Sequence, residues 1–152
     1  MPQIKADVVE VFVVRWRNGK IETLLAKRKS QQPIGSIWQP FSARLDLGEA
    51  TIEGAKRAVV RGCGLQVTEL FALDRTHQFF DHQRDLIVIA PVLAAMVHAT
   101  APKAGADFEA VDWQDASTAQ NNLFIAGHRE LHRRVVELLG PGGTALDLYR
   151  LL

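Results

Sequence analysis

Apolar and polar positions along the chain predict a set of strands with two main helices. The run Asp7–Trp16 is β-branched and apolar, which is typical of a buried strand. Asn18-Gly19 gives a strong hairpin signal, so Ile21–Arg28 is expected to return as the partner strand. Further strands are predicted at residues 37–42, 65–73, 86–97 and 108–113. Residues 77–85 are expected to form a polar loop, and Pro91 predicts a bulge or an edge.

Two segments show the 3.6-residue period of amphipathic helices. Thr51 is a candidate N-cap before a helix that ends at Gly62-Cys63-Gly64. A second helix is predicted over Gly127–Leu139, and Asp115 or Ser117 is expected to cap a short helix before it. Strands mixed with helices in this order predict an α/β or α+β fold, with a sheet sandwiched between helices.

Composition narrows the class of protein further. The 152 residues fit one domain, with 47% hydrophobic and 23% charged residues and a net charge of +1. This balance argues against a nucleic-acid coat or a polybasic membrane anchor. A single cysteine, Cys63, excludes an intramolecular disulfide and a cysteine-based zinc cluster. No apolar run resembles a signal peptide or a membrane span, so we expect a cytoplasmic protein without membrane or nucleic-acid partners.

The segment from Trp38 to Leu65 reads as strand, loop, helix and glycine stop. It resembles the Nudix box of hydrolases that act on nucleoside-diphosphate-linked compounds; the matching positions are Glu49, Arg57, Val59, Gly64 and Leu65. The resemblance implies one Nudix-like domain over residues 1–152, an α/β/α sandwich around a central mixed sheet. It places the degenerate box at 43–65 and a C-terminal helix with an apolar tail at 127–152. It also implies a nucleotide or nucleotide-like phosphate as ligand.

The chain departs from the box where the family binds metal. Ala43 replaces the opening glycine, and Ala58, Arg61 and Gly62 replace the three helical glutamates. These positions are spaced i, i+3 and i+4 and share one helix face, where three carboxylates would hold hard divalent cations. Here the charge of that face goes from −3 to +1, so we predict no metal at it. Arg61 is instead expected to attract a phosphate directly.

The remaining candidate residues follow from the resemblance and from their chemistry. Glu49, Arg57 and Asp107 are candidate catalytic residues, although Glu49 and Arg57 are more simply interpreted as a structural pair that holds the loop against the helix. Glu53, four residues before Arg57, is an alternative partner for it. The candidate ligand-binding residues are Arg28, Trp38, Arg44, Arg61, Phe79 and Arg84.

Acidic residues elsewhere offer an alternative metal site. Mg²⁺ or Mn²⁺ is expected as a cofactor only if these carboxylates converge, and ordinary solvated carboxylates are the simpler interpretation. The acids in question are Asp46, Glu49, Glu53, Asp81, Asp85 and Asp107.

His128 and His132 lie one helical turn apart with Glu130 between them. No third ligand is evident, so a solvated helix face is predicted in preference to a zinc site. Cys63, between two glycines, is interpreted as a buried small residue.

Three functions remain open from the sequence. The first is a Nudix-type protein that binds a nucleoside di- or triphosphate, with metal-dependent hydrolysis lost or weak. The second is an active hydrolase with relocated acids. Trp113-Gln114-Asp115-Ala116 and Arg129 give it a distant similarity to the branch that cleaves dihydroneopterin triphosphate or dATP. The third is a protein-interaction module in which the apolar tail, residues 145–152, completes a homodimer.

Overall fold

The computed structural model of the chain describes residues 1–98, 101–140 and 149–152. Eight strands in these residues form one sheet. Their bounds are β1 (Gln3–Lys5), β2 (Val8–Arg17), β3 (Lys20–Arg28), β4 (Trp38–Gln39), β5 (Phe41–Arg44), β6 (Glu69–Asp81), β7 (Leu86–Met96) and β8 (Phe108–Asp115). The sheet is mixed, because β7 runs parallel to β1 and β2 and antiparallel to β6.

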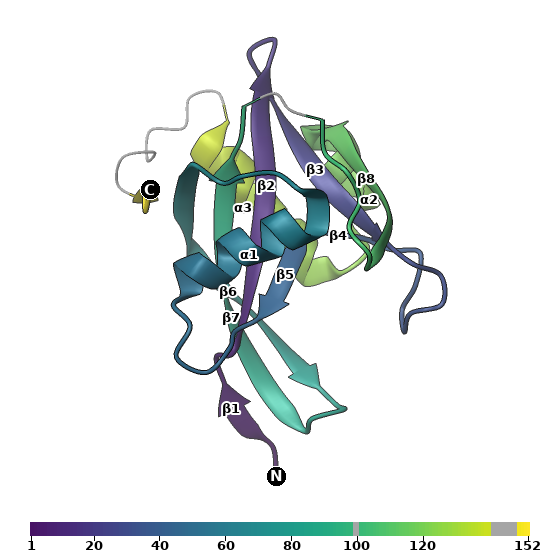
Figure 1. Cartoon of the computed structure of the whole chain (residues 1–152), viewed down its shortest axis with the longest axis vertical. Helices are drawn as coiled ribbons and strands as arrows, with labels where there is room; N and C mark the ends of the chain where they lie inside the picture. The colour runs from purple at the N-terminus through teal and green to yellow at the C-terminus, as the bar shows by residue number, and fades with distance from the viewer. Residues whose placement is uncertain (99–100, 141–148) are drawn as a thin grey trace.

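The sheet is covered on both faces by helices. Helix α1 (Thr51–Cys63) crosses the front of the sheet in Figure 1, and α3 (Ala126–Leu139) lies behind it. The short α2 (Ala116–Asn122) leads into α3. This arrangement confirms the expected sandwich with a central mixed sheet.

The alternating side chains of β2 contribute to the hydrophobic core on each face of the sheet. Phe12 and Val14 join the buried cluster under α3, whereas Val11 and Val13 join the cluster under α1. Glu10 shares the phase of Phe12 and therefore belongs to the α3 side, where it is buried with 5% of its surface exposed. The consequence of this placement becomes clear at the site described below.

The β6–β7 hairpin differs from the sequence-based expectation. Residues 77–85 were expected to be a polar loop, but β6 continues to Asp81 and pairs with β7 through Thr76–Asp81. The prediction failed because exposed strand residues are polar and resemble a loop in composition. Strand β6 also begins at Glu69 and not at residue 65. The bulge expected from Pro91 is confirmed: the register shifts between Ala72 and Thr76, and Thr76 faces Pro91.

Local signals at the turns and helix ends are mostly confirmed. Asn18 and Gly19 both have positive φ, 52° and 74°, and connect β2 to β3. Gly64 ends α1 in the left-handed conformation, and Asp115 caps α2 by accepting a hydrogen bond from the Thr118 N–H. Thr51 is not the N-cap of α1, since Ala50 occupies that position without a side-chain cap.

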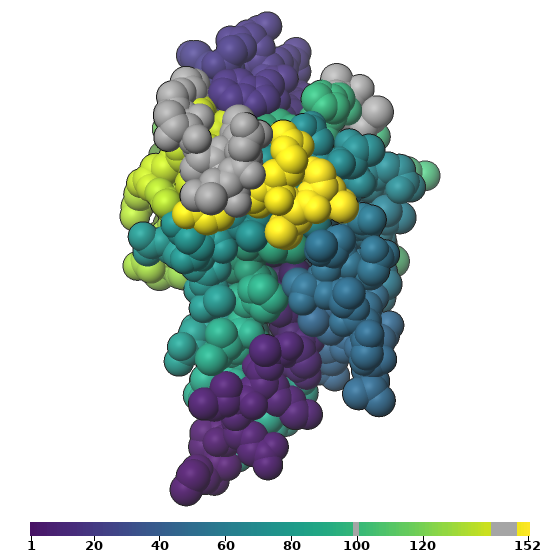
Figure 2. All heavy atoms as spheres, turned by 90° about the vertical axis from the view of Figure 1, so that its left-hand side faces the viewer, coloured from purple at the N-terminus to yellow at the C-terminus, as the bar shows by residue number. Residues whose placement is uncertain are grey.

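The end of the chain packs against its own domain. The Leu151 N–H donates to the Leu70 carbonyl over 2.7 Å, and Arg150 forms a bridge with Phe71 of β6. Figure 2 shows these last residues in yellow on the upper half of the molecule, above the protruding β1. The preceding part of the expected tail, residues 141–148, lies outside the described residues. None of the described helices has the length and apolar composition needed to cross a bilayer.

Candidate functional site

The residues of the degenerate box meet at one cavity of about 330 Å³ beside α1. The wall comes from β5, from the exposed side of α1 and from the segment that precedes β8. Three arginines and two aspartates supply its charge, namely Arg44, Arg57, Arg61, Asp46 and Asp107. Ala58 and Gly62 line it as well, so all three positions that replace the helical glutamates face the same hollow.

Glu49 and Arg57 form a paired clamp at one side of this cavity. The Arg57 guanidinium donates to both carboxylate oxygens of Glu49, over 3.0 and 2.7 Å, and to the Arg44 carbonyl over 2.8 Å. Glu49 also accepts from the Asp46 N–H. The Arg57 guanidinium, followed by that N–H, holds the pKa of Glu49 to about 2. The pair therefore ties the loop before α1 to the helix, and Glu53 contacts Lys56 and not Arg57.

Arg61 and Asp107 form an exposed ion pair on the opposite side of the cavity. Their closest atoms are 3.5 Å apart, and the side chains are 70% and 52% exposed. An ion pair this exposed contributes little stability and opens at small cost. The segment that carries Asp107 is anchored to the end of α1, because the Lys103 N–H donates to the Cys63 carbonyl and the Gly105 N–H to the Gly62 carbonyl.

Gly62 lies against an aromatic wall. A Cβ placed at residue 62 would overlap the Phe41 ring and come within 3.3 Å of Phe108. Phe41 is fully buried and meets Phe108 edge to face. A glutamate at residue 62 would therefore require the Phe41 ring to shift.

The geometry does not fit the divalent metal that the box binds in Nudix hydrolases. Ala58 and Gly62 offer no ligand atom, and Arg61 brings a positive charge. Of the candidate replacement acids, Asp46 and Asp107 line the cavity, whereas Asp81 lies on the β6–β7 hairpin, where it binds Arg84. Within residues 1–98, 101–140 and 149–152, three or more potential metal ligands come together only at Glu10, His77 and His128, on the α3 side.

The other expected ligand-binding residues lie away from the cavity. Arg28 reaches Gln39 over 3.5 Å, and Trp38 packs against the core under α3. Phe79 lines a different cavity, between β6 and α3. Arg84 is occupied by Asp7 and Asp81 at the base of the β6–β7 hairpin.

The helix-face interpretation of the two histidines is wrong, because His128 and His132 are 5% and 0% exposed. His132 accepts from the Thr23 hydroxyl and donates from Nδ1 to the Gln120 side-chain oxygen, each over 2.8 Å. Burial lowers its pKa to about 4. His128 instead donates from Nε2 to Glu10 over 2.6 Å, and His77 binds the other oxygen of that carboxylate.

The Glu10 carboxylate remains ionised between the two histidines. Its burial favours the neutral form, but the hydrogen bonds from His128 and His77 outweigh this and lower its pKa to about 2. Glu10 and His77 were not among the residues expected to form a site. One signal was available: Glu10 is the single charged residue in the apolar run Val8–Val14.

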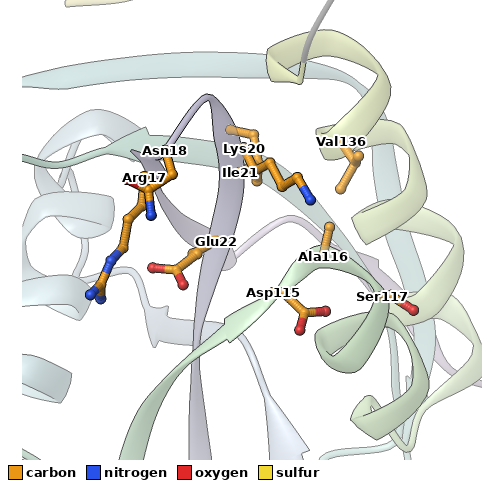
Figure 3. A pocket seen from close by; sticks show the side chains of 9 residues that line it. All are labelled: Arg17, Asn18, Lys20, Ile21, Glu22, Asp115, Ala116, Ser117 and Val136. Atoms are coloured by element: carbon orange, nitrogen blue, oxygen red, sulfur yellow. The ribbon is translucent and has the colours of Figure 1, made fainter.

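A further cavity, of about 730 Å³, lies between the β2–β3 hairpin and helices α2 and α3. Figure 3 shows the Lys20 side chain extending toward Val136 of α3, while the carboxylates of Glu22 and Asp115 lie apart. Both acids have structural partners, since Glu22 binds Arg15 and Asp115 caps α2. None of the candidate catalytic or ligand-binding residues lines this hollow, although Asp115 and Ala116, which carry the similarity to the dihydroneopterin triphosphate or dATP branch, do.

Comparisons with known proteins agree with this fold. No family model matches the chain. A NUDIX hydrolase from Listeria monocytogenes superposes with a TM-score of 0.78 at 15% identity, over 89% of this chain and 94% of that one. The NUDIX domain of Shewanella oneidensis NrtR, complexed with ADP ribose, gives 0.73 at 14% identity, over 90% and 88%. The chain therefore has the Nudix fold.

One sequence relative is a longer protein. The chain is 30% identical over 129 residues to an octanoyltransferase from Myxococcus xanthus, a match that covers 83% of this chain. The same match covers only 35% of the octanoyltransferase, so the chain spans about a third of that relative's length.

Proposed function

We propose that this chain binds the diphosphate of a nucleotide-type ligand through the arginine-lined cavity beside α1, without the metal-dependent hydrolysis of the fold. The observation that carries the proposal is the face formed by Ala58, Arg61 and Gly62, which replaces three carboxylates by one guanidinium. Arginine's planar fork matches phosphate oxygens and needs no bridging cation. A volume of about 330 Å³ suits the phosphates more than an entire dinucleotide.

Arg61 is the residue best placed to contact the ligand. Arg57 is committed to Glu49, whereas the partner of Arg61 among the described residues is exposed Asp107, in a pair that a phosphate can displace. The NrtR domain with the same fold binds ADP ribose, which contains a diphosphate. ADP-ribose and ADP are therefore the first ligands to test.

Calorimetric titration with ADP-ribose, ADP and ATP, each in chelator and in Mg²⁺, tests the proposal. We expect binding of at least one ligand in chelator, with an affinity that Mg²⁺ does not increase. Replacement of Arg61 by alanine should weaken binding by about tenfold, since a hydrogen bond to a charged group contributes about 1.5–3 kcal/mol.

Lys56→Ala is the matched control, because it removes a positive charge from the same helix outside the cavity. It should bind as the wild type does. Absence of binding by all three ligands, or binding that depends on Mg²⁺, would overturn the proposal. If both substitutions weaken ligand binding equally, the effect comes from the overall positive charge of α1 and not from a contact of Arg61.

Hydrolysis by relocated acids is a second candidate, since Asp46 and Asp107 both line the cavity. It predicts phosphate or pyrophosphate release from these ligands in Mg²⁺ or Mn²⁺, abolished by Asp107→Asn. We favour binding alone, because Asp107 is paired with Arg61 and two exposed aspartates lack the third carboxylate of the usual set. A metal-stimulated turnover that Asp107→Asn removes would reverse this preference.

The octanoyltransferase relative raises acyl transfer as a further candidate. Transfer through a thiol needs an accessible thiolate. Cys63, the single cysteine, is fully buried, its thiol donates to the Val59 carbonyl, and burial raises its pKa. We therefore expect no gain of mass by the protein after incubation with an activated octanoyl donor.

A further inference from the structure

Three side chains that can each offer a metal ligand, one carboxylate and two imidazoles, converge on the α3 face of the sheet, opposite the arginine-lined cavity. Glu10 comes from β2, His77 from β6 and His128 from the first turns of α3. One oxygen of Glu10 contacts His77 Nδ1, and the other accepts from His128 Nε2 over 2.6 Å. One ligand atom from each residue lies within 4.8 Å of the other two.

The fold directs these groups inward from positions far apart in the sequence. The alternation along β2 places Glu10 beneath α3, and the end of the β6 bulge sets the phase that turns His77 toward it. The two imidazole rings lie with their centroids 4.9 Å apart, and Phe79 packs on His77 at 5.2 Å. Glu10 and His128 are each 5% exposed, so this cluster is largely shielded from water.

The ligand set is that of a borderline divalent ion. Two imidazoles with one glutamate form a three-ligand set that binds Zn²⁺ and leaves a fourth position open. Tetrahedral bonds of about 2.0–2.2 Å place ligand atoms about 3.4 Å apart. The distances between the ligand atoms here range from direct contact to 4.8 Å, and the ideal spacing lies within that range. Side-chain adjustments of about an ångström would therefore admit the ion.

The hydrogen-bonded network leaves one polar atom of the cluster without a partner in the described part of the chain. His128 Nδ1 is buried and finds no hydrogen-bond partner among the described residues, whereas buried polar atoms are nearly always paired. The opposite edge of His77 faces α3 at Gly127, where an added Cβ would lie 2.6 Å from Nε2. The glycine therefore keeps the approach to His77 clear.

One of the three residues reaches a cavity. His77 lines a hollow of about 580 Å³ between β6 and the start of α3, together with Gly127, Gln78 and Glu130, whereas Glu10 and His128 do not line it. Gly127 lies at the Nε2 edge of His77, opposite the Nδ1 atom that contacts Glu10. The cluster therefore has the ligand identity and the shielding that a metal site requires.

We propose that Glu10, His77 and His128 bind one Zn²⁺ ion, or a divalent ion of similar preference, with a fourth coordination position left open. This site is separate from the proposed phosphate site, which lies on the other face of the sheet. It also differs from the expected histidine pair, because His132 belongs to the Thr23 and Gln120 network and not to the ligand set.

Competition against a chromophoric zinc chelator, with elemental analysis of the dialysed protein, measures the stoichiometry and affinity. We expect one equivalent of Zn²⁺ per chain. His77→Gln and His128→Gln should each weaken binding by at least about a hundredfold, since each leaves two protein ligands. His82→Gln, on the exposed hairpin turn, should bind as the wild type does, and Arg61→Ala should also retain zinc if the two sites are independent.

The wild-type protein provides a test that does not depend on how the variants fold. On addition of one equivalent of Zn²⁺, the imidazole resonances of His77 and His128 should shift and those of His82 and His98 should not. Zinc binding below one equivalent, shifts confined to the exposed histidines, or folded ligand variants that bind like the wild type would each overturn the proposal.

Discussion

At the scale of single residues, Gly62 decides what the box helix can carry. Because residue 62 has no side chain, the buried Phe41 ring packs where its Cβ would lie. The absence of a carboxylate at this position is therefore accompanied by close packing. Ala58 is 5% exposed and the Arg61 side chain is 70% exposed, and both line the cavity together with Gly62. The three replaced positions therefore differ in how far the surrounding structure has closed around them.

Gly62→Ala should lower the free energy of unfolding, although alanine favours helices over glycine. Overpacking a filled core costs about 1–3 kcal/mol, which exceeds the helix preference of roughly 1 kcal/mol. Denaturant unfolding measures the change. In the Phe41→Leu background the cost should shrink, because the ring that meets the new methyl group is gone. A Gly62→Ala protein as stable as the wild type would contradict the packing described for Phe41.

His132 should make stability depend on pH. Its pKa of about 4 lies below the usual 6.5, so between these values the unfolded chain binds a proton that the folded chain does not. The free energy of unfolding should therefore fall as the pH drops from 6.5 to 4, by at most about 3 kcal/mol. The free energy of unfolding, measured from unfolding curves across this pH range, should change less steeply with pH in His132→Gln than in the wild type. His82→Gln should keep the wild-type slope, and an unchanged slope in His132→Gln would refute the assignment.

At the scale of elements, the clamp between Glu49 and Arg57 joins the loop of the box to α1. Three contacts share the work: the bidentate guanidinium, its bond to the Arg44 carbonyl, and the Asp46 N–H that Glu49 accepts. The clamp sets the side of the cavity on which Arg57 lies. It thus keeps the frame of the box although the metal ligands are absent.

Glu49→Gln should destabilise the protein only where Glu49 is ionised. A carboxyl with its pKa lowered from 4.5 to about 2 stabilises the fold fully above pH 4.5 and loses this contribution as the pH falls toward 2. The difference in melting temperature between wild type and variant should accordingly be largest near neutral pH and shrink in acid. Glu53→Gln, on the exposed surface of the same helix, is the control. A difference that is independent of pH would show that the charge of Glu49 plays no part.

Sequence patterns predicted those elements that depend on neighbouring residues. The Asn18-Gly19 turn, the Gly64 helix end and the Asp115 cap all arise within a few positions of the chain, and all are confirmed. The environment of His128 could not be predicted in this way, because its partner Glu10 lies 118 residues away. A polar strand such as the end of β6 is also indistinguishable from a loop until its pairing with β7 is known.

The arginine-lined cavity shows the same division between local and distant information. Ala58, Arg61 and Gly62 were expected to share a helix face, and helical spacing places them there. Asp107 reaches them only because the segment before β8 bonds to the last carbonyls of α1. Phe79 and Arg84 were expected near a ligand, but pairing along the β6–β7 hairpin places them elsewhere.

At the scale of the whole molecule, the C-terminal residues close one edge of the sheet. Arg150 contacts the Phe71 ring and Glu69, and the Tyr149 hydroxyl donates to Asp74, which Arg134 also binds. These contacts are all made within one chain. They give the end of the chain a role in stability that does not require a second copy.

Removal of residues 149–152 should lower the melting temperature and leave the mass in solution unchanged. The deletion exposes Leu70 and Phe71 and removes the backbone pairing with β6. Calorimetry and light scattering measure the two quantities. Arg150→Ala, which keeps the backbone contacts, should have a smaller effect on melting. A halved mass after the deletion would instead support a homodimer that the tail completes.

The packing of the Phe41 ring on Gly62 also restricts the order in which substitutions in this segment can occur. A lineage that carries both residues cannot add a side chain at residue 62 without a shift or a replacement of the Phe41 ring, whereas Ala58 and Arg61 carry no such restriction. Replacing Phe41 by a smaller residue would relieve the contact but leave a void in the core. The packing of the Phe41 ring on Gly62 therefore favours further divergence of this segment over restoration of the box.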